Sequence, residues 1–198
     1  MKELKEQNVK MFDRIAEVYD KGIIKKWSLT IQKNIIDSLK FKRNSKILDV
    51  GCGTSNLLSM LYKKDNSFAL YGIDISTKML KVSKEKLKGR VKLKVIPIEN
   101  INYKNKFDYI FSVDSFHHYY NQDKALKNMF FALKKGGNLV IVDIDFGIIF
   151  NKIFHIIEPG NNRIIRHLDM TKLFKLNKFK KVRQKKIWYF TFMTIGKK

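Results

Sequence analysis

The part of this sequence that says most about its chemistry is a glycine turn, with an aspartate at the end of the next apolar run. The strand-forming run at 47–50 stops at a Gly-Cys-Gly turn, and a helical pattern begins near Asn56. Because glycine lacks a Cβ and tolerates a positive φ, such a turn brings backbone N–H groups close to a ligand. Twenty-three residues after Gly51 a second apolar run ends on Asp74, whose carboxylate can accept hydrogen bonds from both ribose hydroxyls. The two features predict a nucleoside-bearing cofactor.

The residues around the turn also indicate which cofactor it is. A nicotinamide-binding loop requires a third glycine where this chain has Asn56, and no Gly-x-x-x-x-Gly-Lys-[Ser/Thr] phosphate loop occurs. Asp49 stands directly before the turn. Its carboxylate would repel a pyrophosphate, but it would suit a ligand that carries an ammonium and a sulfonium.

A second group of polar residues lies at the end of the predicted strand 107–113. His117 and His118 have side chains whose pKa lies near neutrality, so either could accept a proton from a hydroxyl or an activated carbon. Asp114 is a further candidate for this role. The structural alternative is that one histidine packs beneath the loop and bonds a backbone carbonyl. Adjacent histidines diverge, so no metal site is predicted.

The elements that must position these residues alternate along the chain. Helical periodicity over 3–20 and 27–39 precedes the first strand. Strands are predicted at 46–50, 69–74, 91–96, 107–113, 138–144, 179–185 and 187–195, and helices at 56–64, 77–88, 122–135 and 169–176. Ser76 is the expected N-cap of helix 77–88, and Gly136-Gly137 the expected end of helix 122–135. Such alternation predicts an α/β fold with a parallel sheet and right-handed crossovers.

Four segments resemble the motifs of class I S-adenosylmethionine-dependent methyltransferases in order and spacing. Residues 47–55 resemble the first motif, V-L-D-x-G-C-G-T-G, and residues 71–76 the second, with Asp74 as the ribose acid. Residues 107–118 resemble the fourth-strand region, and residues 133–141 the L-K-P-G-G-x-L-x-I turn. Near the N-terminus, residues 11–20 are similar to the F-D-x-x-A-x-x-Y-D opening of the type 11 group, which includes the ubiquinone and menaquinone C-methyltransferases.

This resemblance implies a single Rossmann-like domain over 1–198. We expect a seven-stranded, mostly parallel sheet with an antiparallel last strand, helices on both faces, an N-terminal helical cap at 1–44, a cofactor-binding core at 45–145 and a substrate-side segment at 146–198. The implied reaction is methyl transfer from S-adenosylmethionine to a small-molecule acceptor by in-line displacement. The residues expected to bind the cofactor are Tyr19, Asp49, Gly51, Cys52, Gly53, Asp74, Ile75, Ile98, Glu99 and Ser112.

Two residues depart from the family pattern. Ser55 replaces the third glycine of the first motif, and we expect it to crowd the methionine end of the cofactor. Pro97 replaces the acid that would bond the adenine amino group. These departures motivate the alternative of a non-catalytic, cofactor-binding relative.

Composition bears on the partners. The chain has 198 residues and a formal charge of +23, but only six of its 41 basic residues are arginine, and the lysines are spread along the sequence. A nucleic-acid partner, and with it RNA methylation, is therefore open but not favoured. The apolar segment 146–157 suggests a lipophilic acceptor, such as a quinone or lipid methylated at a membrane surface. Cys52 is the single cysteine, which is consistent with a reducing cytoplasm. The oligomeric state is left open.

Overall fold

The computed structural model describes residues 2–148, 150–151 and 162–198. Its centre is one seven-stranded sheet in the order β3-β2-β1-β4-β5-β7-β6. The strands are β1 (Lys46–Val50), β2 (Ala69–Asp74), β3 (Lys92–Val95), β4 (Phe107–Val113), β5 (Leu133–Ile144), β6 (Lys180–Trp188) and β7 (Thr191–Lys197). The first five strands run parallel, and β7 lies antiparallel between β5 and β6. The predicted seven-stranded, mostly parallel sheet is confirmed.

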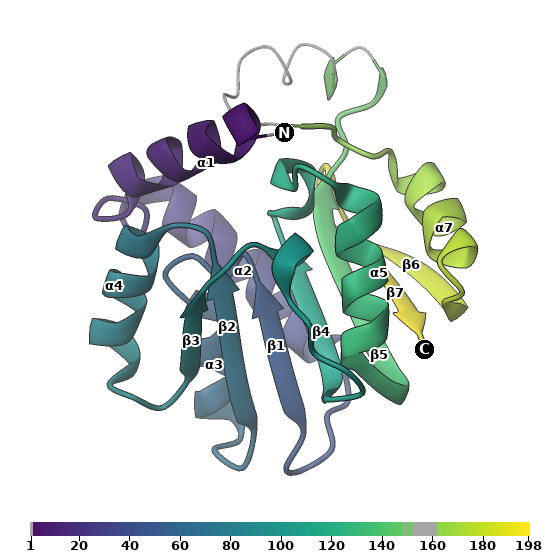
Figure 1. Cartoon of the computed structure of the whole chain (residues 1–198), viewed down its shortest axis with the longest axis horizontal. Helices are drawn as coiled ribbons and strands as arrows, with labels where there is room; N and C mark the ends of the chain where they lie inside the picture. Colours follow the sequence, from purple (N-terminus) through teal and green to yellow (C-terminus); the bar gives the residue numbers. More distant parts are fainter. Residues whose placement is uncertain (1, 149, 152–161) are drawn as a thin grey trace.

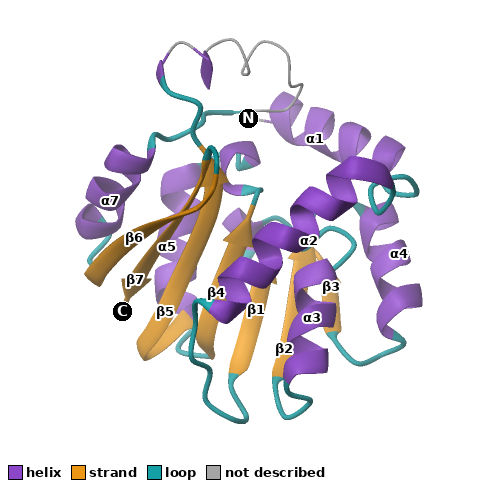
Figure 2. Ribbon diagram, turned by 180° about the vertical axis from the view of Figure 1, so that it is seen from behind, coloured by secondary structure: helices purple, strands orange, loops and turns teal. Residues whose placement is uncertain are grey.

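Helices cover both faces of this sheet. Figure 2 shows α2 and α3 in front of one face, and Figure 1 shows α5 and α7 on the other. The helix α1 crosses above the carboxyl ends of the parallel strands (Figure 1). The helices are α1 (Lys2–Ile15), α2 (Gly22–Asp37), α3 (Asn56–Lys64), α4 (Thr77–Leu87), α5 (Gln122–Ala132) and α7 (His167–Leu176), with 3-10 turns η1 (Ile98–Asn100) and η2 (Phe116–His118).

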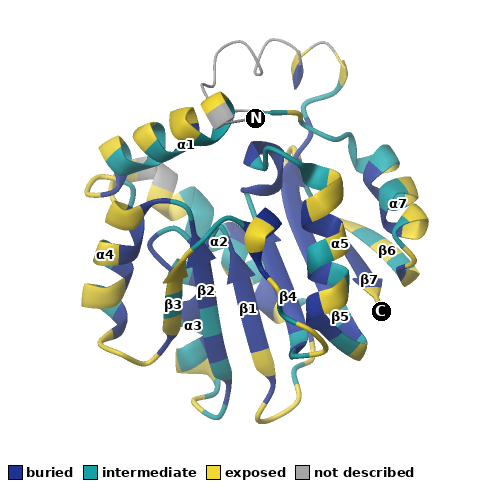
Figure 3. Cartoon of the chain, viewed as in Figure 1, coloured by how far each residue is buried: buried dark blue, intermediate teal, exposed yellow. Residues whose placement is uncertain are grey.

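Two apolar clusters hold the helix layers against the sheet. In β1, Ile47 packs into a cluster with Ile35 and Leu58 from α2 and α3, whereas Leu48 packs into a second cluster with Leu126 from α5. Adjacent strand residues point to opposite faces, and a parallel strand between two helix layers is buried on both. The central strands are accordingly dark blue in Figure 3. This burial explains why β1 has apolar residues on both of its faces.

Three helix ends differ by three residues or more from those predicted. The first helix ends at Ile15, and the next begins at Gly22, whose φ is +65°. The helix expected to end at Gly136-Gly137 ends at Ala132 instead, and both glycines lie inside β5. The pairing of β5 with β4 shifts in register at Phe107, and Gly136 has a φ of +79°. A bulge in a strand and a helix stop both use glycine at positive φ, so the local pattern did not separate them.

The apolar segment 146–157 lies only partly within the described residues, because 149 and 152–157 fall outside them. Its described members Ile148 and Phe150 are exposed. Within the described residues, no helix is both long and apolar enough to cross a membrane. The proposed division into cap, core and substrate-side segment stays a prediction.

Candidate functional site

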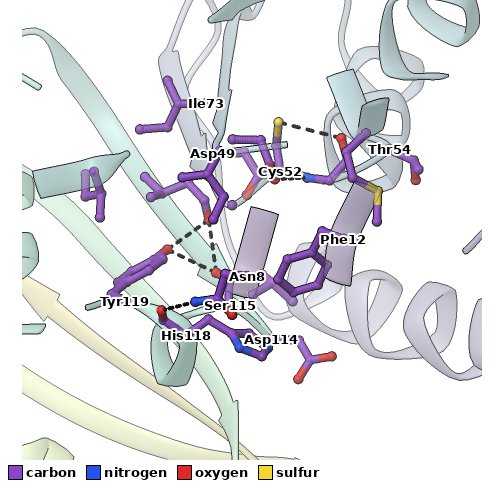
Figure 4. Close-up of a pocket in the computed structure, with 18 of the residues that line it drawn as sticks. Asn8, Phe12, Asp49, Cys52, Thr54, Ile73, Asp114, Ser115, His118 and Tyr119 are labelled. Carbon is purple, nitrogen blue, oxygen red and sulfur yellow. Dashed lines mark hydrogen bonds between the residues drawn. The ribbon is translucent and has the colours of Figure 1, made fainter. Parts of the chain in front are cut away.

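A pocket opens at the carboxyl edge of the parallel strands, beneath α1 (Figure 4). About 990 Å³ of space lies between its walls, part of it open to solvent. Most of the predicted site residues line this pocket, and so does Asp114. Those lining it are Tyr19, Asp49, Gly51, Cys52, Gly53, Asp74, Ile75, Ile98, Glu99 and His118. Ser112 and His117 do not belong to the lining.

The glycine turn lines the pocket and is tied to the neighbouring strand. Gly51 and Cys52 donate their backbone N–H groups to the carbonyl of Ile73, at 2.9 and 3.0 Å. Gly53 donates its N–H to Asp74 Oδ2 at 2.8 Å. These three N–H groups are therefore hydrogen-bonded within the protein, and the expectation that the turn lies close to a ligand stays a prediction. Glycine is required at residue 51 for another reason: its φ is +68°, and a Cβ there would lie 2.7 Å from the Cβ of Ser115.

Two buried carboxylates face the pocket from β1 and β2. Asp74 accepts hydrogen bonds from the N–H groups of Gly53 and Ser76, both at 2.8 Å, and its two oxygens keep further lone pairs for a ligand. Burial raises the pKa of Asp74. Burial, and then the charge of Asp74, raise the pKa of Asp49 well above its usual range. A cationic ligand would offset both effects, so this wall fits the ammonium and sulfonium of S-adenosylmethionine.

Ser55 does not crowd the pocket. It has a φ of +61°, the left-handed conformation that favours glycine, and its side chain is fully buried. Its Oγ lies 2.6 Å from the Oγ of Ser83 on α4 and accepts a hydrogen bond from it. The hydroxyl therefore points between α3 and α4. The prediction that Ser55 crowds the methionine end of the cofactor is wrong. Pro97 precedes η1, and Glu99 accepts a hydrogen bond from the N–H of Asn121 at 3.2 Å.

The two histidines have different surroundings. His117 Nδ1 lies 2.6 Å from Asp143 Oδ1, and the His117 N–H donates to Asp143 Oδ2 at 3.0 Å. His117 is 2% exposed and lies outside the pocket lining, which contradicts its assignment beside the substrate. His118 does line the pocket, and its ring meets the edge of Phe12 with the ring centres 5.0 Å apart.

Ser112 is likewise placed behind the pocket surface. Its Oγ forms hydrogen bonds with Ser115 Oγ at 3.0 Å and with the Tyr119 hydroxyl at 2.8 Å. Both of those groups also donate to the carbonyl of Val50, at 3.1 Å. This buried network fixes the end of β4 against β1, and a contact between Ser112 and the cofactor stays a prediction.

Sequence reasoning missed Asp143 and the cluster it completes. Asp143 comes from β5, 26 residues beyond His117, and one oxygen or nitrogen each of Asp114, His117 and Asp143 lie within 4.8 Å of one another. Acids at metal-ligand spacing were not expected here. The 2.6 Å contact between His117 and Asp143 has the length of a charge-assisted hydrogen bond, which orients the imidazole.

Asp20, between α1 and α2, joins the cap to the glycine turn. Its Oδ1 accepts hydrogen bonds from Thr54 Oγ1 at 2.8 Å and Asn56 Nδ2 at 2.7 Å. Its Oδ2 accepts from Lys86 Nζ at 2.5 Å, and Lys86 also donates to the Thr54 carbonyl. Burial alone would raise the pKa of Asp20, but these hydrogen bonds and the charge of Lys86 lower it. The carboxylate therefore stays ionised and holds the cap over the pocket.

The sheet order, the glycine turn and the acid at the end of β2 together define a class I S-adenosylmethionine-dependent methyltransferase fold. The family model described as "Methyltransferase domain" matches residues 41–192. The chain belongs to this family, whose members use S-adenosylmethionine.

Curated relatives agree with this assignment. The ubiquinone/menaquinone biosynthesis C-methyltransferase of Geotalea daltonii is 29% identical over 161 residues, which are 73% of this chain and 67% of that protein. The demethylmenaquinone methyltransferase of Thermotoga maritima is 28% identical over 148 residues, 71% of this chain and 62% of that protein. The match thus spans about two thirds or less of these relatives.

Solved structures show the same fold. A SAM-dependent methyltransferase from Aquifex aeolicus superposes with a TM-score of 0.69 and 19% identity, covering 87% of this chain and 95% of that one. The Haemonchus contortus phosphoethanolamine N-methyltransferase 2, in complex with phosphomonomethylethanolamine and S-adenosylhomocysteine, has a TM-score of 0.72 and 22% identity, covering 87% of this chain and 43% of that one.

Proposed function

We propose that this protein transfers a methyl group from S-adenosylmethionine to a small-molecule acceptor by in-line displacement. The observation that supports this most strongly is that one pocket joins the buried acids Asp49 and Asp74 to Asp114 and His118 beneath α1. The cofactor and an acceptor would share this space. The single cysteine, Cys52, is in keeping with a cytoplasmic enzyme.

The chain's own contribution would be alignment and exclusion of water. When bound, S-adenosylmethionine supplies an electrophilic methyl carbon on a sulfonium. The acceptor's nucleophile would attack this carbon on the side opposite sulfur, and the carbon–sulfur bond would break as the new bond forms. Holding the reacting atoms in line can contribute about 7–11 kcal/mol. In this proposal the acceptor would bind beside His118, which lines the pocket and would take the nucleophile's proton.

Calorimetric titration of S-adenosylmethionine and S-adenosylhomocysteine into the purified protein tests the cofactor. We expect micromolar dissociation constants for both. S-adenosylhomocysteine production would then be followed with acceptors from quinols to phospholipid headgroup amines. If the protein binds neither cofactor form, it is a non-catalytic relative and the proposal fails.

A lipophilic acceptor at a membrane surface is the second candidate. It is supported by a cluster of exposed apolar side chains at the same edge of the molecule as the pocket. This aromatic tip consists of Ile148, Phe150, Trp188, Tyr189 and Phe190. Phe190 is anchored to the end of β5, because its carbonyl accepts the Asp145 N–H at 2.8 Å and its ring packs on Phe146. The quinone-related names of the relatives point in the same direction.

A further inference from the structure

One buried polar atom in the pocket wall has no hydrogen-bond partner among the described residues. Asn8 on α1 is 1% exposed and lines the pocket. Its Nδ2 donates to the backbone carbonyl of His118 at 2.9 Å, but no donor from the described part of the chain reaches its Oδ1. Buried acceptors without a partner are rare because they lose their hydrogen bonds to water and gain none in return.

The orientation of this amide follows from its neighbour. A backbone carbonyl only accepts hydrogen bonds, so the NH₂ group of Asn8 must face His118 and the oxygen must be the unpartnered atom. Exchanging the two atoms would set two oxygens against each other. Asn8 is therefore held as a fixed acceptor.

Asn8 lies next to the end of the pocket formed by the loop after β4. Figure 4 shows Asn8 close to Ser115, His118 and Asp114, whereas Thr54 lies farther away. The Phe12 ring, one turn along α1 from Asn8, lies against the ring of His118. A second buried acceptor without a partner among the described residues, Gln32 Oε1, enters the same pocket from α2. The cap thus brings polar acceptors to a wall whose other side chains include Phe12 and Val113.

We infer that Asn8 Oδ1 accepts a hydrogen bond from an O–H or N–H group of the methyl acceptor. The inference rests on the proposed function and narrows its substrate to a class: compounds that carry a hydrogen-bond donor on an apolar body that can pack against Phe12 and Val113. A site built around a buried acceptor discriminates against analogues in which the donor is capped, because the acceptor is then left without a partner.

Matched aromatic probes test this with the protein saturated by S-adenosylhomocysteine. The probes are 1-naphthol and 1-aminonaphthalene, which carry a donor, and 1-methoxynaphthalene, which does not. Dissociation constants are measured by calorimetry for the wild type, Asn8→Ala and the control Gln7→Ala, an exposed residue on the same helix. We expect the wild type and the control to bind at least one donor probe tenfold or more tightly than 1-methoxynaphthalene. Asn8→Ala should reduce that preference to less than about twofold.

The outcomes separate this inference from the proposed function. Failure to bind S-adenosylhomocysteine contradicts the proposed function before any probe is added. Tight S-adenosylhomocysteine binding together with equal or absent binding of the probes overturns the inference alone. A tenfold loss of S-adenosylhomocysteine affinity in Asn8→Ala would assign the amide to the cofactor and would also overturn it. The comparison of probes in the wild type stands even if the variant does not fold.

Discussion

Asp74 has two tasks, because it holds the glycine turn and also faces the pocket. Replacing it with alanine removes the acceptor for the Gly53 and Ser76 N–H groups and for the ribose hydroxyls. We expect Asp74→Ala to weaken S-adenosylhomocysteine binding by about 1–3 kcal/mol, the usual cost of leaving buried polar groups without a partner. Calorimetry against Asp37→Ala, an exposed aspartate on α2, gives the measurement. Unchanged affinity would disprove the role of Asp74 as ribose acid.

In the absence of cofactor, Asp49 should lower the free energy of unfolding of the protein. Its pKa is raised by burial and then by Asp74, so it keeps its proton at pH values where the unfolded chain has lost it. The unfolded chain then binds fewer protons, and the free energy of unfolding falls as the pH rises above about 3.9. We expect Asp49→Asn to increase the free energy of unfolding at pH 7 by about 1 kcal/mol or more. Denaturant unfolding at pH 5 and pH 8 measures this.

Asp49→Asn should also weaken cofactor binding. The loss of affinity should be larger for S-adenosylmethionine than for S-adenosylhomocysteine, which lacks the sulfonium charge. In the wild type, affinity for S-adenosylmethionine should rise with pH as Asp49 ionises, because the carboxylate attracts the sulfonium only in its charged form. Calorimetry of both ligands across the same pH range provides the comparison. Wild-type affinities for the two ligands that respond equally to pH would contradict a contact between this carboxylate and the sulfonium.

At the scale of elements, two polar contacts position the helices around the glycine turn. Asp20 ties the α1–α2 connection to the start of α3 and, through Lys86, to α4. Ser55 and Ser83 tie the start of α3 to α4 from the buried side. The first contact is part-exposed and ionic, whereas the second is buried and neutral, so the second should contribute more to stability per bond.

Substitutions of Ser55 and Ser83 should change the stability of the protein by amounts that are not additive. Ser83→Ala should destabilise the protein by about 1–3 kcal/mol, because Ser55 Oγ is left buried without its partner. The double variant Ser55→Gly/Ser83→Ala should recover most of this loss, since glycine removes a left-handed strain of about 1–2 kcal/mol. Thermal unfolding of the singles and the double, with Ser59→Ala on α3 as control, provides the test. Strict additivity of the two substitutions would refute the coupling.

At the scale of the whole molecule, the net charge of +23 and the aromatic tip fit an anionic lipid surface. The protein should sediment with vesicles of phosphatidylcholine and phosphatidylglycerol, and less with phosphatidylcholine alone or at high salt. Replacing Trp188, Tyr189 and Phe190 together with serine should lower the partition coefficient at least tenfold, because each buried ring contributes about 1.5–3 kcal/mol.

Phe131→Ser is the matched control, because Phe131 is also exposed but lies at the end of α5 remote from the pocket edge. It should bind these vesicles as the wild type does. If the triple variant also binds like the wild type, the aromatic tip is not a membrane contact and the lipophilic acceptor loses its main structural support.

Local signals predicted the central sheet and, at the ends of β1 and β2, residues that line the pocket. The glycine turn and Asp74 could be found because each follows directly from one strand's end. The sequence alone could not reveal the roles of Asn8, Asp20 and Asp143. Each depends on a hydrogen-bond partner that lies more than 20 residues away in the sequence, on another element. A positive φ at Gly136 was predicted correctly. A helix end and a strand bulge both adopt this conformation, however, so the residue alone did not indicate which of them occurs.

The contact between Ser55 and Ser83 also couples the two positions when the sequence changes. Starting from glycine at residue 55, a serine there meets the left-handed strain alone unless a hydroxyl already stands at residue 83. A lineage that acquired Ser83 first would instead bury a hydroxyl at residue 83 without this partner, so either order passes through a destabilised intermediate. Once both are present, reversion of residue 83 becomes the costly step, so the pair is historically entrenched although neither serine lines the pocket.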